Sequence, residues 1–224
     1  MSSIKVSSAL VALAATLAAQ SPAPKTKDGK PDLSGFWQPD NKFTGDFAKA
    51  LKPGEKIAML PAGEKVMKAR SPKEDPATTR CLPMGVPRLS PYPEKIVQTP
   101  KEIMILEEGD IHTFRSIYMT RKHPEELPPS WYGDSTGKWE GDTLVVDTTS
   151  FNDRTWLDAV GHPHGEKLHV IERYRRPSLD RLDLEVTVED PEFYSKPFTM
   201  SGSFKLVTDR EIHERYCYKS PADK

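Results

Sequence analysis

Hydrophobic and polar residues alternate with a period of two along much of the second half of the chain. Residues 182–189 read Leu-Asp-Leu-Glu-Val-Thr-Val-Glu, and residues 198–206 read Phe-Thr-Met-Ser-Gly-Ser-Phe-Lys-Leu. Such alternation is typical of a β-strand with one buried face and one solvated face. Apolar runs of similar length predict further strands at 103–107, 111–119, 143–149, 168–175 and 212–218.

Short turn signals divide these strands into pairs. Glu-Gly-Asp occurs at 108–110 and at 140–142, and polar turns fall at 177–180 and 208–210. These signals predict about four successive hairpins, or about eight strands. An antiparallel meander of that size usually closes on itself, because closure removes its exposed edges. We therefore predict an all-β fold, a barrel over residues 94–220 that holds one small ligand. A two-sheet sandwich is the alternative.

The segment 21–93 has a different character. Proline makes up 21 of the 224 residues, and many of the prolines fall here. The pattern predicts a linker and irregular wrapping segments, with short helices at 47–51 and 62–69 bounded by prolines. This Pro-rich N-terminal region is expected to pack around the barrel and to contribute little strand.

Residues 1–20 resemble an export signal. Lys5 is followed by an Ala-rich apolar run at 6–19 and by small residues that suit a signal peptidase. The run is shorter than the ~20 residues that a membrane-spanning helix needs. We expect a periplasmic or secreted protein with no stable membrane span after signal cleavage. The alternative is an uncleaved anchor or a buried helix.

Charge and cysteine content narrow the possible partners. The 32 basic residues nearly balance the 33 acidic ones. The sequence has no run of basic residues, so we expect no nucleic-acid partner. Cys81 and Cys217 are the only cysteines, and an oxidising compartment favours a disulfide between them. Two buried thiols remain the alternative. Neither cysteine has metal-type spacing, so no metal is assigned.

The segment 150–166 carries the densest set of chemically able side chains. In a meander, the links 120–136, 150–167 and 189–197 lie together at one barrel end. We assign His164 as an acid/base group near neutral pH, oriented by Asp158 or Asp153. We expect Arg154 to bind a carboxylate group of the substrate or to polarise a carbonyl group of the substrate. In the alternative interpretation, these groups cap or tie down the loop, and His162 with His164 could also chelate a metal.

Aromatic and amide side chains on the same links are candidates for binding a substrate. Trp131, Tyr132 and Trp156 could stack on a ring, or could instead form a hydrophobic plug under the loops. The full set of expected substrate-binding residues is Trp131, Tyr132, Asn152, Trp156, His123 and Tyr194.

Several catalytic motifs are absent from the sequence. It has no Gly-x-Ser-x-Gly elbow, no phosphate-binding glycine loop and no dinucleotide fingerprint, so no cofactor is indicated. The remaining possibility is cofactor-free acid/base chemistry on a small organic molecule, of the lyase, isomerase or cyclase type. The alternatives are a non-catalytic carrier for a hydrophobic or glycan ligand and an envelope scaffold. The oligomeric state stays open.

Two resemblances accompany this interpretation. Gly35-Phe36-Trp37 resembles the Gly-x-Trp that opens the first strand of lipocalins, in which the Trp plugs the closed end of the barrel; it implies a lipocalin-like (calycin-type) barrel. A longer series is similar to an uncharacterised exported family of soil bacteria such as acidobacteria. It comprises residues 28–37, 81–88, 139–146, 151–158 and Glu172-Arg173-Tyr174. That resemblance implies export and a bacterial source, and it transfers no catalytic residue. The chain departs from the family's Cys-x-Glu-Asn ending.

Overall fold

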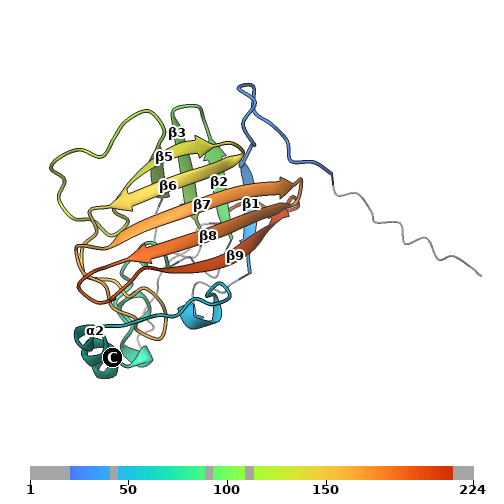
Figure 1. Cartoon of the computed structure of the whole chain (residues 1–224). Coiled ribbons are helices and arrows are strands. Elements are labelled where there is room, and N and C mark those ends of the chain that lie inside the picture. The colour runs from blue at the N-terminus through green and yellow to red at the C-terminus, as the bar shows by residue number, and fades with distance from the viewer. Residues whose placement is uncertain (1–20, 41–44, 89–92, 109–113, 214–224) are drawn as a thin grey trace, which may run out of the picture.

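A closed β-barrel forms the body of the protein in the computed structural model, which describes residues 21–40, 45–88, 93–108 and 114–213. Figure 1 shows the strands wrapping around one interior. Within these residues, nine strands follow one another around the barrel in chain order, and the last pairs with the first. They are β1 Gly35–Pro39, β2 Glu94–Gln98, β3 Glu102–Glu107, β4 Phe114–Tyr118, β5 Asp134–Glu140, β6 Thr143–Thr149, β7 His169–Ser178, β8 Arg181–Glu189 and β9 Phe198–Val207.

The predicted all-β barrel is confirmed, and the period-two strands are its most regular part. On β8, Leu182, Leu184, Val186 and Val188 are fully buried inside the barrel, while the residues between them face outward. The hairpins around 140–142 and 177–180 are present as β5–β6 and β7–β8. Gly141 adopts a φ of 61° in the two-residue turn between β5 and β6, a conformation that favours glycine.

The expected purely antiparallel meander requires a correction at β4 and β5. These two strands run parallel and pair only at Ile117↔Ser135 and Tyr118↔Thr136. Because β4 runs in the same direction as β5, β3 ends and β4 begins at the end of the barrel where β5 begins, whereas the meander model required the opposite end. The link from β4 to β5 therefore runs from one end of the barrel to the other.

The barrel also begins earlier than residue 94. Strand β1 lies within the segment 21–93 that we had assigned to linker and wrapping segments, and it pairs with both β2 and β9. Strand β1 pairs with the edge of β9 that the predicted hairpin at 208–210 would have given to a strand at 212–218. Residues 212 and 213 are not in a strand, and 214–218 lie outside the described residues.

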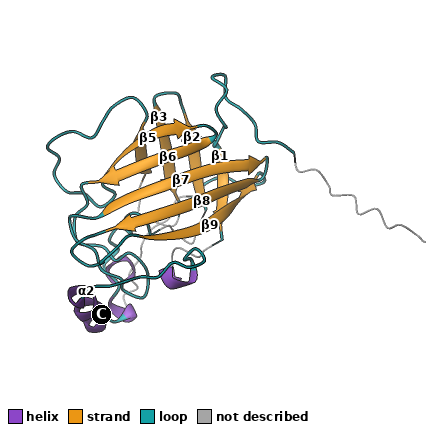
Figure 2. Ribbon diagram, in the orientation of Figure 1, coloured by secondary structure: helices purple, strands orange, loops and turns teal. Residues whose placement is uncertain are grey.

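Residues 45–88 of the N-terminal region cover one end of the barrel, which we call the covered end. Figure 2 shows the helices gathered there. Isolated bridges Leu51↔Met200 and Met59↔Tyr194 attach this region to β9 and to the link before it. Its helical elements are η1 Phe47–Lys49 and α2 Pro61–Ala69, which lie close to the two helices expected from the sequence, and η2 Pro72–Glu74 and α3 Pro76–Thr79, which were not expected. None of the described helices has the length and apolar character to cross a membrane.

The opposite end of the barrel, which we call the Arg176 end, is closed by Trp37. The Trp37 indole is fully buried and donates a hydrogen bond to the Leu33 carbonyl at 2.9 Å. The Arg176 guanidinium stacks on the Trp37 ring at 4.9 Å and donates to the Asp32 and Leu179 carbonyls. Two chain segments distant in sequence are thereby joined across the barrel bottom.

Two sequence-based expectations fall on residues outside the described part of the chain. The export signal at 1–20 lies there entirely. Cys217 also lies outside, whereas Cys81 lies in the covering region after α3 with a φ of 56°. Export and the Cys81–Cys217 bridge therefore stay predictions.

Candidate functional site

Polar and ionisable side chains gather inside the barrel, where the strand pattern would otherwise place apolar ones. On β7, residues 170, 172, 174, 176 and 178 all point inward, and the second of them is Glu172, with no exposed surface. Neighbouring strands contribute further polar groups, of which Ser135 and Thr148 are register partners, as are Glu94 and Glu107. We call this set the interior polar cluster; it consists of Glu94, Glu107, Arg115, Ser135, Thr148, Glu172 and Tyr174.

Arg115 on β4 holds the cluster together. Its Nη1 donates to Oε1 of Glu172 at 2.9 Å, and its Nη2 donates to the other oxygen of the same carboxylate. Nε donates to the Ser135 hydroxyl at 3.1 Å, and Nη2 also donates to the Thr148 hydroxyl at 2.9 Å. Burial alone would lower the pKa of Arg115, but the Glu172 carboxylate outweighs it and raises that pKa. The pair is therefore a fixed internal ion pair.

Tyr174 completes the environment of Glu172. The Tyr174 hydroxyl donates to Oε1 of Glu172 at 3.0 Å, and the ring is buried. Burial, followed by the charge of Glu172, raises the pKa of Tyr174 well above its usual value. The phenol therefore stays a neutral donor, and together with Nη1 of Arg115 it holds the same carboxylate oxygen of Glu172 in place.

Glu94 and Glu107 add two more carboxyl groups. They are register partners on β2 and β3, and Glu94 is only 2 % exposed. Burial first, then the neighbouring charges of Glu107 and Glu172, raise the pKa of Glu94 well above its usual value. Its Oε1 is buried and has no hydrogen-bond partner among the residues that the structure describes. Glu94 is thus a carboxyl group that keeps its proton at a pH where an exposed glutamate has lost it.

This arrangement has a recognisable chemical capacity. Two adjacent carboxyl groups repel each other when both are ionised, so such a pair tends to keep one proton. One group can then act as an acid and the other as a base. A buried polar atom without a partner is rare in folded proteins and calls for an explanation, such as a ligand or a catalytic role. Glu94 meets both descriptions.

The loop 150–166, our sequence-based candidate, is packed against the covered end and its polar groups bond one another. Links 150–167 and 189–197 share this end, as expected, and the last residues of link 120–136 reach it: Gly165 N–H donates to Asp190, and Asn152 N–H donates to the Ser130 carbonyl. Link 120–136 starts at the opposite end, where β4 finishes, so the expectation is met only in part. Asp158 has no exposed surface and accepts the backbone N–H groups of Phe47, Gly161 and His162. Its carboxylate therefore stabilises the loop.

The structure pairs the expected catalytic residues differently from our assignment. Asp158 contacts Nδ1 of His162 at 2.6 Å, and no bond joins it to His164 among the described contacts. His164 is 3 % exposed; its Nε2 lies 2.6 Å from the Thr155 hydroxyl and its Nδ1 lies 3.2 Å from the Gly165 carbonyl. Burial lowers the pKa of His164. Arg154 and Asp153 are exposed, so these four residues do not converge on one group.

The expected binding residues are likewise spread out. Trp156 is 7 % exposed beneath the Arg70 guanidinium at 5.0 Å, and the Tyr194 hydroxyl donates to the Pro163 carbonyl at 2.7 Å. Asn152 caps the turn at Arg154 through its side-chain oxygen. Trp131 and Tyr132 are half-buried, and Tyr132 packs against the core. These contacts favour the alternative in which the aromatic residues form a plug under the loops.

His123 belongs to a separate network on the outer wall of the barrel. Its Nδ1 lies 2.6 Å from Asp134, and its Nε2 lies 3.0 Å from Asp147. Asp147 also contacts His169, whose other ring nitrogen lies 3.1 Å from Glu189. The network crosses β5, β6, β7 and β8 on the face that points away from the interior polar cluster.

A possible metal-binding group occurs where the loop meets the covering region. Ligand atoms of Asp46, Asp158 and His162 lie within 4.8 Å of one another. However, both Asp158 oxygens already accept two hydrogen bonds each, and Asp46 caps η1 through Ala48 N–H. A metal ion there would have to displace structural hydrogen bonds, so we assign these residues to loop stability.

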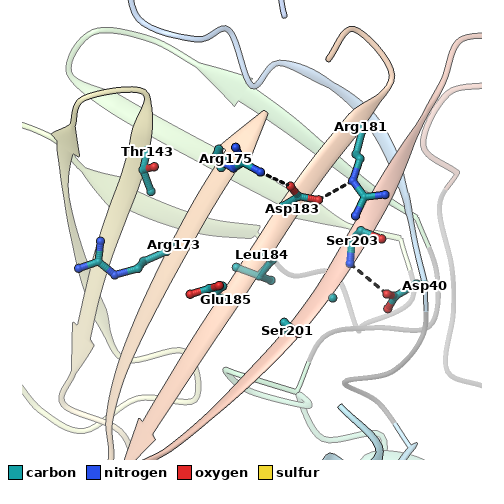
Figure 3. Close-up of a pocket in the computed structure, with 11 residues that line it drawn as sticks. Asp40, Thr143, Arg173, Arg175, Arg181, Asp183, Leu184, Glu185, Ser201 and Ser203 are labelled. Carbon is teal, nitrogen blue, oxygen red and sulfur yellow. Dashed lines mark hydrogen bonds and ion pairs between the residues drawn. The ribbon is translucent and has the colours of Figure 1, made fainter. Parts of the chain in front are cut away.

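A charged groove of about 410 Å³ lies on the outer face of β6 to β9. Figure 3 shows Asp183 between two arginines, with Arg181 at 2.6 Å and Arg175 at 3.1 Å, and Ser203 N–H donating to Asp40 at 3.0 Å. Exposed ion pairs of this kind contribute ~0–1 kcal/mol and are common on sheet surfaces. The interior polar cluster is the stronger candidate for chemistry.

Comparison with protein-family models, with curated proteins and with solved structures finds no match to this chain. The fold and the interior polar cluster therefore carry the functional argument. Sequence reasoning missed this cluster, although one signal for it was present: Glu172 occupies an inward position in the alternation of β7, between Val170 and Tyr174.

Proposed function

We propose that this protein is exported and acts on a small organic molecule by cofactor-free acid/base chemistry, of the lyase, isomerase or cyclase type. We further propose that the proton passes through Glu94 in the interior polar cluster. The observation that supports this most directly is the raised pKa of a buried carboxyl group whose Oε1 has no hydrogen-bond partner among the described residues.

Glu94 would act as the acid. A carboxyl group with a raised pKa can give its proton to one substrate atom, which leaves Glu94 as a carboxylate, and the Glu107 carboxylate beside it can take a proton from another substrate atom, so that the proton given and the proton taken balance. Arg115 and Glu172 neutralise each other, so the net charge that the cluster presents to a substrate is the single negative charge of Glu107. A neutral or weakly polar molecule fits such an interior better than a multiply charged one.

The proposal moves the proton-transfer step from His164 to Glu94. Both ring nitrogens of His164 are already bonded within the loop, and its lowered pKa leaves it neutral. The loop 150–166 would then serve to hold the covered end in place next to the long links.

A carrier without catalytic activity is the second candidate. The interior beyond the cluster is strongly apolar, with Phe198, Met200 and Phe204 on β9 among its fully or nearly fully buried side chains. A carrier would use Glu94 to donate one orienting hydrogen bond, and would leave the bound molecule unchanged.

Solvent deuterium incorporation separates the two candidates without knowledge of the reaction. The protein is incubated in D₂O with a panel of small carbonyl compounds and unsaturated acids, and exchange at carbon is measured by mass spectrometry. We expect exchange that falls ~10²–10⁴-fold in Glu94→Gln. The control is Glu185→Gln on the outer face of β8, which should keep the wild-type rate. Binding that depends on Glu94 without any exchange would favour the carrier, and equal exchange by Glu94→Gln would refute the assigned role.

A further inference from the structure

A pocket of about 580 Å³ opens at the Arg176 end, away from the covered end. It lies between the N-terminal segment, the β2–β3 turn and the second half of β5. In Figure 1 this is where the blue N-terminal segment passes the tip of the β5–β6 hairpin, and Lys25 lies 3.4 Å from Asp142 there. Its lining residues are Thr26, Lys27, Asp28, Gln98, Thr99, Pro100, Met119, Gly137, Lys138 and Trp139. Pockets of this size hold small organic ligands.

The pocket exists because β4 and β5 separate. Among the described residues, β4 pairs with β5 only as far as Tyr118↔Thr136, so β5 continues from Gly137 to Glu140 without a strand on that side. A Cβ on Gly137 would lie 2.6 Å from Sδ of Met119, so the glycine leaves the space beside β5 that the Met119 side chain fills. The opening is therefore set by the register of the barrel.

The pocket has one apolar wall and a basic rim. Met119 and Trp139 pack against the barrel core with part of their surface, and the rest of that surface lines the pocket. Lys27 and Lys138 lie at the rim and are exposed, and Asp28 is the only acidic lining residue described. The indole offers a flat apolar surface, and Lys27 offers an exposed positive charge. Lys138 offers a second one; its ammonium forms an exposed ion pair with Glu140 at 2.9 Å, which a bound anion can replace because exposed pairs are weak. Together these groups match a molecule with an apolar body and one anionic group.

We propose that this pocket binds a small amphipathic organic anion, whose apolar body lies on Trp139 and Met119 and whose anionic group lies between Lys27 and Lys138. The site is separate from the interior polar cluster, because it is at the other end of the barrel and uses none of its residues. It therefore stands or falls independently of the proposed acid/base function, and Glu94→Gln should leave it unchanged.

Two matched fluorescent probes test the proposal on the full chain. 1-Anilinonaphthalene-8-sulfonate has an aromatic body and one negative charge, and N-phenyl-1-naphthylamine has the same body without the charge. We expect the anion to bind more tightly and to quench Trp139 by energy transfer. The double variant Lys27→Ala/Lys138→Ala should weaken the anion roughly five- to tenfold and change the neutral probe less than about twofold.

Three further variants complete the design. Lys49→Ala/Lys122→Ala removes two exposed lysines elsewhere on the molecule and should leave both affinities unchanged. Trp139→Leu should weaken both probes, and Trp139→Phe should keep binding but lose the energy transfer from this position. Circular dichroism checks that each variant is folded. The proposal is overturned if the folded wild type prefers the neutral probe, or if Lys27→Ala/Lys138→Ala binds the anion as the wild type does.

Discussion

Asp158 lies 2.6 Å from Nδ1 of His162, and the same carboxylate accepts the backbone N–H of Phe47, 111 positions earlier in the chain. The loop 150–166 is thereby bonded to the start of η1 as well as to itself. Because Asp158 has no exposed surface, these donors have no access to water that could replace it.

Replacing Asp158 by alanine should strongly destabilise the protein. The change leaves the N–H groups of Phe47, Gly161 and His162 and the His162 ring without their acceptor. Each unsatisfied buried donor costs ~1–3 kcal/mol, so we expect a loss of roughly 3 kcal/mol or more in the free energy of unfolding. Urea denaturation measures it. Asp153→Ala, at an exposed position of the same loop, should stay within about 0.5 kcal/mol of wild type, and equal effects of the two substitutions would contradict a structural role for Asp158.

The strands that the sequence pattern predicts differ from those that it misses in the residues at their inward positions. β8 and β9 were predicted because their inward positions are apolar, so the alternation is visible. β5 has Ser135 and Gly137 at its inward positions, and β2 begins with the buried Glu94. A polar residue at an inward position removes the alternation, so β2 and β5 were not predicted, whereas β3, β4, β6 and β7, which carry the rest of the cluster, keep enough apolar positions to be predicted.

The long loop was misjudged for a related reason. A segment of 150–166 that leaves the barrel must satisfy its own buried backbone groups, and Asp, Asn and His side chains are the residues that do so. From the sequence alone, the same residues suggest acid/base chemistry. Only the contacts of Asp158 and His164 distinguish the two uses.

Glu172→Gln should destabilise the barrel by breaking an internal ion pair. Both nitrogens Nη1 and Nη2 of Arg115 donate to this carboxylate, and Arg115 is 4 % exposed. Removing one partner of a buried pair leaves an uncompensated charge and commonly costs ~3–5 kcal/mol. Thermal and urea denaturation measure the loss. The double variant Arg115→Met/Glu172→Leu removes both charges and should recover much of it; a single variant as stable as wild type would show that the pair is not the organising contact.

The outer-wall network should make stability depend on pH near neutrality. Burial by itself lowers the pKa of His169, but hydrogen bonds to Asp147 and Glu189 outweigh it and raise the pKa above the ordinary value of 6.5. A histidine with a raised folded pKa stabilises the fold fully below its unfolded pKa, and this contribution is lost as the pH rises through the folded pKa. His169→Gln should therefore flatten the fall in the free energy of unfolding above pH 6.5. An unchanged slope in denaturation series across this range would contradict the pairing, and Lys167→Gln, at an exposed neighbouring position, is the control.

Glu94→Gln should stabilise the protein at neutral pH, although it removes the proposed acid. Burial and the charges of Glu107 and Glu172 raise the pKa of Glu94, so the folded state binds a proton that the unfolded state releases. Between the unfolded pKa and the raised folded pKa, the unfolded state binds fewer protons, and the free energy of unfolding therefore falls as the pH rises. Glutamine keeps the size and the neutral hydrogen-bonding groups but does not titrate.

We expect a higher midpoint of urea denaturation than wild type at neutral pH, a smaller difference at acid pH, and the loss of an infrared carbonyl band from a protonated carboxyl group. A protein that gives up stability at a buried acid in this way has the trade-off expected of a functional site. If Glu94→Gln is instead less stable than wild type at neutral pH, or the infrared band is absent from the wild type, Glu94 is ionised in the barrel and the proposed proton transfer loses its acid.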